Sequence, residues 1–281
     1  MSKTPLNSAL WVVATPLGNL GDISSRAVSV LKKAEVILAE DTRRAGRLLQ
    51  GLDISGKRLL SLHEHNEDQR ISQVVKNVDQ GMDCCLISDA GTPLMADPGY
   101  RLVRAFRKKG LPVIPVPGPC APVTALMASG IAPYPFSFLG FVPRKKGELE
   151  ALFTRWKDVP TTLVFFERKN RVSSCLEVAC RVLGPREFCL ARELTKKFEE
   201  FIFGVLGSTE VSSQDLLGEI TIVLGPPDRE PSRTDPARVL ELIREYRDRG
   251  HRPRKLVGLV QAGTSGWTSK EIYDLVVRGD N

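Results

Sequence analysis

Residues 192–196, with the sequence RELTK, combine one carboxylate with two cations in a single short segment. A glutamate can accept a proton as a general base, and a nearby lysine or arginine can stabilise a developing negative charge or bind a phosphate. The segment follows a predicted strand, Glu187–Ala191, and so would lie at the end of a sheet. We therefore name Glu193 as a candidate base and Arg192 and Lys196 as candidate phosphate or alkoxide partners. The alternative is an ordinary surface ion pair.

Two other carboxylates follow predicted strands and are alternative proton acceptors. Asp41 comes after Val36–Ala39, and Asp89 comes after Cys84–Ser88. Asp41 also stands two residues before Arg43, in a position typical of a helix N-cap.

Glycine and proline are concentrated in three loops that follow predicted strands: 15–22 (TPLGNLGD), 89–99 (DAGTPLMADPG) and 117–121 (PGPCA). Any one of them is explained as a tight turn, but ligands of open α/β sheets bind beyond the carboxyl ends of the strands. Glycine allows close approach of the backbone, and proline fixes it. We expect the first, fourth and fifth strands to flank a crevice whose backbone groups suit a neutral adenosine and a cationic sulfonium.

Two common nucleotide signatures do not describe this crevice. The pattern G-x-G-x-x-G is absent from the sequence. Residues 51–57 match G-x-x-x-x-G-K, but Arg58 replaces the required Ser or Thr and the match precedes a strand, so we interpret it as chance.

Short β-branched runs alternate with amphipathic windows in the first half of the chain, which is typical of a doubly wound parallel sheet. The predicted strands are Leu10–Ala14, Val36–Ala39, Arg58–Leu62, Cys84–Ser88 and Val113–Val116. The predicted helices are Ser24–Lys33, Thr42–Leu49, Gln69–Gln80 and Tyr100–Lys109.

The composition changes at 133–147, where prolines flank an aromatic cluster, and we place a hinge there. A second α/β domain is predicted from Thr162–Phe166, Glu187–Ala191, Glu200–Val205 and Ile220–Leu224, with a helix at Val172–Val182. A proline-rich linker leads to short helices at Ala237–Arg249 and Ser269–Val277. The expected domains are 1–133 (cofactor-binding), 134–226 (second α/β domain) and 227–281 (linker and helical tail).

Composition favours a globular protein with an anionic partner. The net charge is +7 and the pI about 9.2, with several separate clusters of Lys and Arg. The six cysteines form no C-x-x-C pair, and we expect reduced thiols, no metal site and a cytoplasmic protein. We interpret His63-Glu64-His65 as a loop rather than a metal site. The first apolar run, 9–14, is far too short to span a membrane.

Several ordered motifs resemble one known family. They are 13–23 (VATPLGNLGDI), 39–43 (AEDTR), 63–67 (HEHNE), 88–93 (SDAGTP) with 97–100 (DPGY), and 192–196 (RELTK). Together they resemble the tetrapyrrole methylase family, in the branch that methylates cytidine 2′-hydroxyls of small-subunit (16S) ribosomal RNA. The resemblance extends over nearly the whole chain.

That resemblance implies two α/β domains, S-adenosylmethionine in the cleft between them, a homodimer, and methylation of a cytidine in the decoding region of 16S ribosomal RNA. The segments it matches to cofactor contacts contain Leu17, Gly18, Asp89, Ala90, Gly91, Thr92, Pro93, Met95, Cys120, Ala121, Phe166 and Glu167. Two departures stand out: Cys120 replaces the usual serine, and 168–170 (RKN) replaces a commoner series. The C-terminal helices resemble the family's extension, although Gly258, Gly263 and Gly266 weaken its middle.

Two other functions stay open from the residues alone. One is a methylase of a small tetrapyrrole ring, which would share the fold and the cofactor. The other is a non-catalytic RNA-binding or assembly module that keeps only the fold. The basic clusters and the RELTK segment favour a polyanionic substrate over a pigment.

Overall fold

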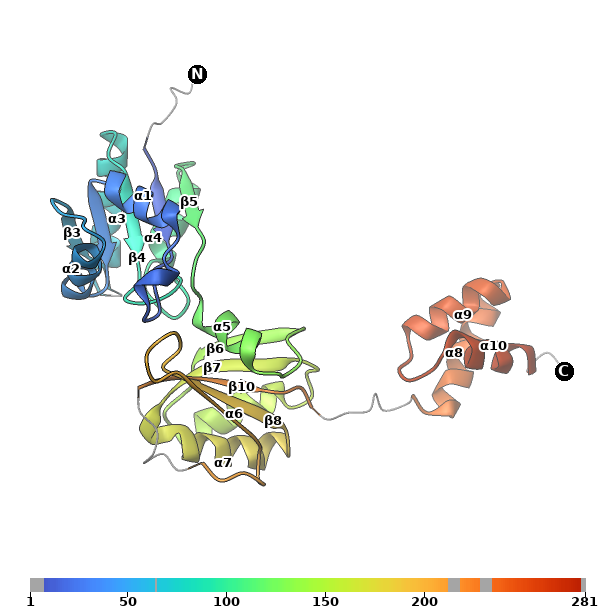
Figure 1. Cartoon of the computed structure of the whole chain (residues 1–281). Helices are drawn as coiled ribbons and strands as arrows, with labels where there is room; N and C mark the ends of the chain where they lie inside the picture. The colour runs from blue at the N-terminus through green and yellow to red at the C-terminus, as the bar shows by residue number, and fades with distance from the viewer. Residues whose placement is uncertain (1–7, 64, 212–217, 228–233, 279–281) are drawn as a thin grey trace, which may run out of the picture. The chain divides into compact units, whose positions relative to one another are not determined.

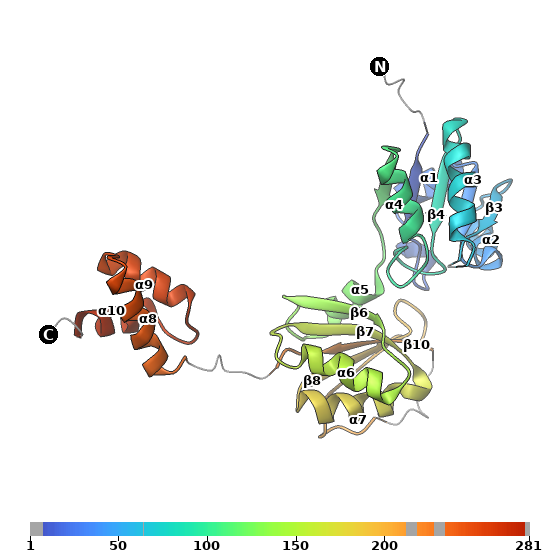
Figure 2. The ribbon, with the colours of Figure 1, turned by 180° about the vertical axis from the view of Figure 1, so that it is seen from behind.

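A computed structural model describes residues 8–63, 65–211, 218–227 and 234–278. The chain divides into two compact units, 1–227 and 228–281, and the expected domain limits at 133 and 226 stay predictions. The first unit contains two sheets, each of five strands among the described residues. Figures 1 and 2 show both units from opposite sides. None of the helices in the described ranges is long and apolar enough to cross a membrane.

The first sheet is parallel, with the strand order β3-β2-β4-β1-β5. Its strands are β1 (Leu10–Val13), β2 (Val36–Ala39), β3 (Arg58–Ser61), β4 (Cys84–Ile87) and β5 (Val113–Val116). The connecting helices are η1 (Leu20–Asp22), α1 (Ser25–Lys33), α2 (Thr42–Gly51), α3 (Glu67–Asp79) and α4 (Tyr100–Lys108). Each predicted strand and helix of this half is confirmed to within two residues at either end.

Both faces of the first sheet are buried because its strands are apolar throughout and neighbouring residues point to opposite sides. Leu38 packs with Phe106 of α4 on one face. Ile37, the adjacent residue, packs with Leu31 of α1 and Leu49 of α2 on the other. Figure 1 shows α1 in front of this sheet, and Figure 2 shows α3 and α4 from the reverse side.

The second sheet is mixed, in the order β6-β7-β10-β8-β9, and β6 and β7 are parallel. Its strands are β6 (Phe136–Phe141), β7 (Thr162–Arg168), β8 (Glu187–Arg192), β9 (Glu200–Val205) and β10 (Glu219–Leu224). The accompanying helices are α5 (Ala121–Ala128), α6 (Lys146–Trp156), η2 (Lys169–Arg171) and α7 (Val172–Leu183).

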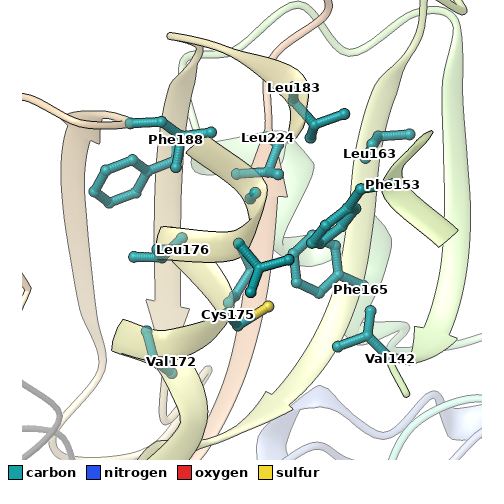
Figure 3. Close-up of a cluster of buried hydrophobic side chains, with 14 of the residues drawn as sticks. Val142, Phe153, Leu163, Phe165, Val172, Cys175, Leu176, Leu183, Phe188 and Leu224 are labelled. Atoms are coloured by element: carbon teal, nitrogen blue, oxygen red, sulfur yellow. The ribbon is translucent and has the colours of Figure 1, made fainter. Parts of the chain in front are cut away.

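Helices α6 and α7 cover one face of the second sheet and make its main core (Figure 3). Phe153 of α6 meets Phe165 of β7 with ring centroids 5.8 Å apart, and both side chains are fully buried. On the opposite face, Leu126 of α5 packs with Val164 and Val223, and Leu17 of the first loop joins this cluster. Leu17 therefore ties the loop after β1 to the second sheet.

The stretch 133–147, where a hinge is expected, contains strand β6 and the start of helix α6, two elements that the sequence did not predict, and the hinge itself stays a prediction. β6 was missed because prolines flank it and, as an edge strand, it keeps Phe136 and Phe141 exposed. Helix α5 was missed because it is apolar all round and has no helical period. Helix α6 does carry a signal, since Leu149, Leu152 and Phe153 are spaced for one helical face.

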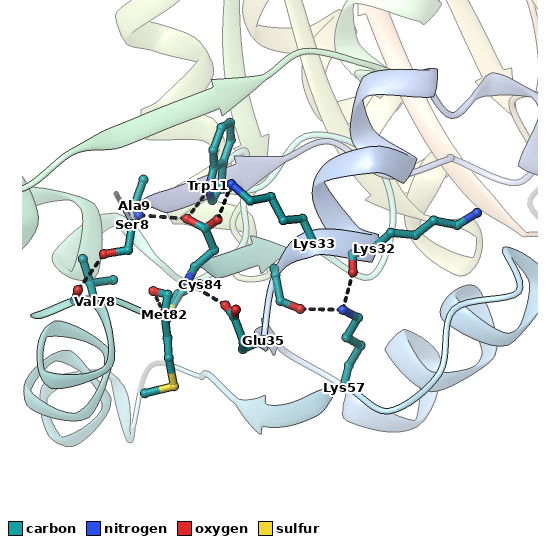
Figure 4. A network of polar contacts seen from close by, with 12 residues as sticks. Ser8, Ala9, Trp11, Lys32, Lys33, Glu35, Lys57, Val78, Met82 and Cys84 are labelled. Carbon is teal, nitrogen blue, oxygen red and sulfur yellow. Dashed lines mark hydrogen bonds and ion pairs between the residues drawn. The ribbon is translucent and has the colours of Figure 1, made fainter. Parts of the chain in front are cut away.

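The buried carboxylate of Asp83 holds together the strand ends opposite the loops, and Figure 4 labels its partners Ala9, Trp11 and Lys33. Asp83 is 6% exposed, and its Oδ1 accepts from the Ala9 amide at 3.0 Å and from Trp11 Nε1 at 2.9 Å. Its Oδ2 pairs with Lys33 Nζ at 3.3 Å. Nearby, Lys57 Nζ donates to the carbonyl oxygen of Ala34 at 2.7 Å, so the lysine of the G-x-x-x-x-G-K match binds backbone.

Replacing Asp83 with alanine is expected to lower the free energy of unfolding by about 2–3 kcal/mol, because it leaves buried donors on Ala9 and Trp11 without an acceptor. Urea denaturation followed by circular dichroism measures the change. Asp79→Ala, at an exposed helix end, is the control and should change stability by less than about 0.5 kcal/mol. Equal stability of the two variants would contradict the role of Asp83.

The second unit is helical, with α8 (Pro236–Asp248), α9 (Pro253–Ala262) and α10 (Ser269–Arg278). Val239, Ile243, Leu256, Val260 and Ile272 form its core. The predicted helices at 237–249 and 269–277 are confirmed, whereas α9 was missed because Gly258 interrupts its pattern.

Candidate functional site

A cleft of about 700 Å³ opens in the first unit, between the loops of the first sheet and the second sheet. Its lining mixes small, apolar and charged side chains. The residues are Leu17, Arg44, Asp89, Ala90, Gly91, Thr92, Met95, Ala96, Asp97, Cys120, Ala121, Pro122, Phe141, Phe166, Glu167, Arg168, Lys169, Asn170, Leu194, Gly218, Glu219, Ile220 and Thr221. This volume lies within the usual range for small-molecule sites, about 300–1,000 Å³.

The loops after β1, β4 and β5 meet as expected, because β1 lies between β4 and β5 in the sheet. The Thr15 amide donates to the Gly91 carbonyl oxygen at 2.8 Å, and the Gly91 amide donates back to Thr15 at 3.1 Å. Thr92 Oγ1 donates to the carbonyl oxygen of Pro119 at 2.9 Å. The loops are therefore joined to one another by hydrogen bonds.

Left-handed backbone is concentrated around the cleft. Leu94 (φ 71°) and Ala96 (φ 77°) belong to the loop after β4, and Glu193 (φ 52°) and Thr195 (φ 64°) to the segment after β8. Among the described non-glycine residues, Asp53 alone has positive φ elsewhere. Such residues store strain and cluster at functional sites. The loop after β4 and the RELTK segment after β8, both singled out from the sequence, thus contain left-handed residues.

The residues expected to contact the cofactor line the cleft, with the exceptions of Gly18 and Pro93. Pro93 is buried behind its loop. Gly18 lies against Lys196: a β-carbon at Gly18 would stand 2.3 Å from Lys196 Cγ. The glycine therefore makes room for the lysine stem.

The candidate catalytic residues Arg192, Glu193 and Lys196 adjoin the cleft but do not line it, whereas Leu194 between them does. Lys196 Nζ contacts Glu193 Oε1 at 3.0 Å and Glu219 Oε2 at 3.3 Å. Glu219, which lines the cleft, also donates its amide to Glu193 Oε1 at 3.1 Å. Arg192 pairs instead with Glu200 on the neighbouring strand.

The charges of this cluster favour a fixed cation. Burial alone would raise the pKa of Glu193, but hydrogen bonds from Lys196 and the Glu219 amide, with the charges of Lys196 and Arg192, lower it overall. Burial would lower the pKa of Lys196, yet its bonds to Glu193 and Glu219 raise it. Lys196 is therefore protonated at neutral pH, and Glu193 is a weak base.

The alternative carboxylates have other partners. Asp41 caps α2, accepting from the Arg43 amide at 2.8 Å, and the Arg43 side chain lowers the pKa of Asp41 well below its usual range. Asp89 lines the cleft, accepts from the Asp41 amide at 3.2 Å and pairs with Arg44 Nε at 3.5 Å. The helix-cap interpretation of Asp41 is confirmed.

The second-sheet side of the cleft is aromatic and basic. Phe166 lies 5.2 Å from the exposed ring of Phe141, measured between centroids. Glu167 is 5% exposed, and its Oε2 accepts from Arg171, so this carboxylate holds η2 in place. Arg168 and Lys169, from the unusual RKN series, line the cleft.

Sequence reasoning missed cleft residues contributed by other elements. Arg44 comes from α2, and Phe141 from β6. Gly218 directly precedes β10, and Glu219 begins it, in register with Arg168 of β7. These residues reach the cleft because β10 lies beside β7 in the sheet, and the sequence alone does not give that strand order.

Asp97 is a titratable group of the cleft that the sequence did not single out. Burial, followed by the negative charges of Glu40 and Asp89, raises the pKa of Asp97 to about 7. Between about pH 4 and pH 7 the folded chain therefore binds more protons than the unfolded chain, and stability contributed by Asp97 falls as pH rises through this interval.

We expect Asp97→Asn to gain stability over the wild type as pH is raised from 5 to 8. Urea midpoints measured across that range test this, with Asp79→Asn as an exposed control. Parallel midpoint curves for wild type and Asp97→Asn would show that Asp97 keeps an ordinary pKa.

Metal chemistry has no support from the geometry of the described residues. No group of three His, Cys, Asp or Glu within these ranges is arranged to hold an ion. His63 and His65 meet edge to face at 6.1 Å, and Glu64 lies outside the described residues.

Burial raises the pKa of the Cys84 thiol to about 12, which makes it unreactive.

Comparison with known proteins covers nearly the whole chain. The sequence profile of the Tetrapyrrole (Corrin/Porphyrin) Methylases matches residues 9–210. A Ribosomal RNA small subunit methyltransferase I of Micromonospora olivasterospora is 39% identical over 272 residues, 95% of this chain and 87% of the relative. The protein of the same name from Neisseria meningitidis serogroup A is 37% identical over 284 residues, 100% of this chain and 97% of the relative.

Solved structures share the fold at low identity. The methyltransferase CobJ has a TM-score of 0.61 at 16% identity, covering 78% of this chain and 94% of that one. A cobalt precorrin-4 methyltransferase of cobalamin biosynthesis has a TM-score of 0.58 at 13% identity, covering 80% and 98%. These likenesses confirm the two α/β sheets expected from the sequence.

Proposed function

Since this chain belongs to the tetrapyrrole (corrin/porphyrin) methylase family, we propose that it methylates the ribose 2′-hydroxyl of a cytidine in 16S ribosomal RNA, using S-adenosylmethionine. The observation that carries this proposal is the match over 95–100% of the chain to relatives named for small-subunit ribosomal RNA methylation. We place this cytidine in the decoding region, as the family resemblance implies. We also propose that the protein acts in the cytoplasm, where its ribosomal RNA substrate would be.

The cleft suits the cofactor in size and chemistry. Ala90, Gly91, Cys120 and Ala121 have small side chains, which leave backbone groups accessible to an adenosine, and the nearby carboxylate of Asp89 suits a cation. S-adenosylmethionine supplies the electrophilic methyl group when bound. The chain's own task is to orient the two reactants and exclude water.

We assign Lys196 to the substrate side of the reaction. A ribose hydroxyl develops negative charge as it loses its proton, and a fixed ammonium stabilises that charge or an adjacent phosphate. Glu193 and Glu219 hold Lys196, and the lowered pKa of Glu193 makes it better suited to this than to accepting the proton. Arg192, paired with Glu200, is assigned to the same phosphate-facing edge.

Basic residues at the cleft favour RNA over the small-ring alternative. Arg44, Arg168 and Lys169 line it, and a polyanion is recognised by such cations. A small-ring methylase would instead yield a methylated pigment, and mass analysis of the product separates the two.

The deciding experiment maps ribose methylation in 16S ribosomal RNA from cells lacking this chain. Loss of one cytidine 2′-O-methyl group, restored by the purified chain and S-adenosylmethionine on isolated subunits, is the expected result. An unchanged methylation map would overturn the proposal. A saturable heat of S-adenosylmethionine binding separates an enzyme from a non-catalytic module.

We also propose that the working form is a homodimer, as the family resemblance implies. Exposed apolar side chains support it: Val123 (51% exposed) and Met127 (79%) lie one turn apart on α5. Light scattering should give a mass near twice the 31.0 kDa of the chain.

A further inference from the structure

The helical tail contains a groove of about 790 Å³ between α9 and α10. Arg254, Val257, Gly258 and Gln261 follow one stripe of α9, at the spacing i, i+3, i+4 and i+7. Ser269, Lys270 and Tyr273 of α10 form the opposite side, and Arg252 and Pro253 stand at one end. We call this the tail groove.

The tail groove carries positive charge without a compensating carboxylate. Arg252, Arg254 and Lys270 are exposed, and no acidic residue lines the groove or pairs with them among the described residues. Two exposed arginines elsewhere in this unit are paired with carboxylates: Arg238 with Glu241 at 2.9 Å and Arg249 with Glu245 at 2.7 Å. The groove therefore presents charge to a ligand and not to its own fold.

The start of α9 adds one hydrogen-bond donor to the same end of the groove, the amide of Arg254, because Pro253 has no N–H and the amides of Lys255 and Leu256 donate to the Arg252 carbonyl oxygen. Arg252 occupies the N-cap position and provides no side-chain acceptor for the first turn, and Pro253 follows it. Uncapped amides at a helix N-terminus attract anions such as phosphate. By contrast, Thr268 and Glu271 cap the start of α10 reciprocally.

Gly258 leaves part of the groove lining without a side chain. It lies inside α9, where glycine weakens a helix, and a β-carbon there would meet nothing within 4 Å. The fold therefore gives no steric reason for a glycine at this position. Without a side chain at Gly258, an RNA strand bound in the groove can approach the backbone of α9 closely.

Tyr273 completes the groove with an aromatic surface. Tyr273 is 51% exposed and lies on the side of the groove formed by α10, opposite Gly258. Single-stranded nucleic acids bind by pairing phosphates with cations while bases stack on aromatic rings. Cations, open backbone and an exposed ring together match that chemistry.

We infer that the tail groove binds single-stranded RNA of the substrate, through phosphates at Arg252, Arg254 and Lys270 and a base on Tyr273. This inference rests on the proposed function for the identity of the RNA. The groove would be a second contact with the substrate, separate from the methylation cleft.

The test uses the full-length chain and unmethylated small ribosomal subunits. Changing Arg252, Arg254 and Lys270 together to glutamine is expected to raise KM for subunits at least tenfold, with kcat and cofactor Kd nearly unchanged. The slope of log K against log salt, measured on a labelled single-stranded fragment of 16S ribosomal RNA, should fall by about 2 for three lost phosphate contacts. The control changes Arg238, Arg244 and Lys255, which removes equal charge outside the groove, and should raise KM less than threefold.

Two variants at Gly258 separate ligand binding from folding. Gly258→Ala should raise the unfolding temperature, and Gly258→Leu should fill the groove and raise KM at least fivefold while the chain stays folded. Equal KM for the groove and control variants would overturn the inference. So would loss of subunit binding with normal binding of the RNA fragment, because the occupant would then be a protein. RNA binding is measured without turnover, so an inactive wild-type chain would refute the proposed function and leave this result readable.

Discussion

Replacing Lys196 with alanine is expected to lower kcat for methylation of small ribosomal subunits by about 100- to 1,000-fold, the usual effect of removing a fixed donor from a developing oxyanion. The Kd for S-adenosylmethionine should change less than about twofold, since Lys196 adjoins the cleft without lining it. Single-turnover kinetics and calorimetry measure the two quantities.

Three further variants isolate the charge of Lys196. Lys196→Met keeps the stem that lies over Gly18 and should be as inactive as alanine, whereas Lys196→Arg should retain part of the activity. Lys197→Ala changes the neighbouring exposed lysine, which lies over the ring of Phe198, and should be nearly normal. Activity in Lys196→Met, or equal loss of kcat and cofactor affinity in Lys196→Ala, would argue against this role.

A β-carbon at Gly91 is expected to weaken S-adenosylmethionine binding by about 5- to 30-fold. Gly91 has φ 76°, and its added carbon would stand 2.9 Å from Leu17 Cδ2, which lines the same cleft. Left-handed backbone costs an alanine about 1–2 kcal/mol. In the Gly91→Ala variant, the loop after β4 can relieve this strain by shifting when no cofactor is bound. It must return to the strained conformation to bind S-adenosylmethionine, and the free energy of that return lowers the affinity.

Gly56→Ala is the matched control for Gly91→Ala. Gly56 has a similar φ of 69°, with nothing within 4 Å of an added carbon, and it lies outside the cleft. Both variants should lose stability in thermal denaturation, Gly91→Ala more because its added carbon also meets Leu17, but only Gly91→Ala should lose cofactor affinity in calorimetry. If Gly91→Ala and Gly56→Ala bound S-adenosylmethionine with equal affinity, the loop after β4 would not be part of the cofactor site.

The first sheet could be predicted closely because its signals are local. Strands such as Val36–Ala39 are short, apolar and bounded by polar residues, and helices such as α2 begin at a side-chain cap on Asp41. The second half was harder. α5 shows no amphipathic period, and β6 keeps exposed phenylalanines that resemble a loop.

The loops of the candidate site were predictable, but their partners were not. Glycine and proline identify the turns after β1, β4 and β5 from the sequence alone. The pair of Lys196 with Glu193 is local, but its pair with Glu219 depends on β10 pairing with β8, which no local pattern reveals. Gly18, whose cofactor contact stays a prediction, lies beside the side chain of Lys196, and the sequence gives no sign of that neighbour.

The contact between Gly18 and Lys196 links the evolution of two distant positions. An alanine at 18 would collide with the lysine near its root, at Cγ, so a small rotation of the chain end gives no relief. A substitution at 18 therefore needs a change at 196, whereas the lysine can be lost while the glycine stays. A genetic selection for suppressors of Gly18→Ala should return changes at residue 196, and lineages that lose the lysine should be those free to drift away from glycine.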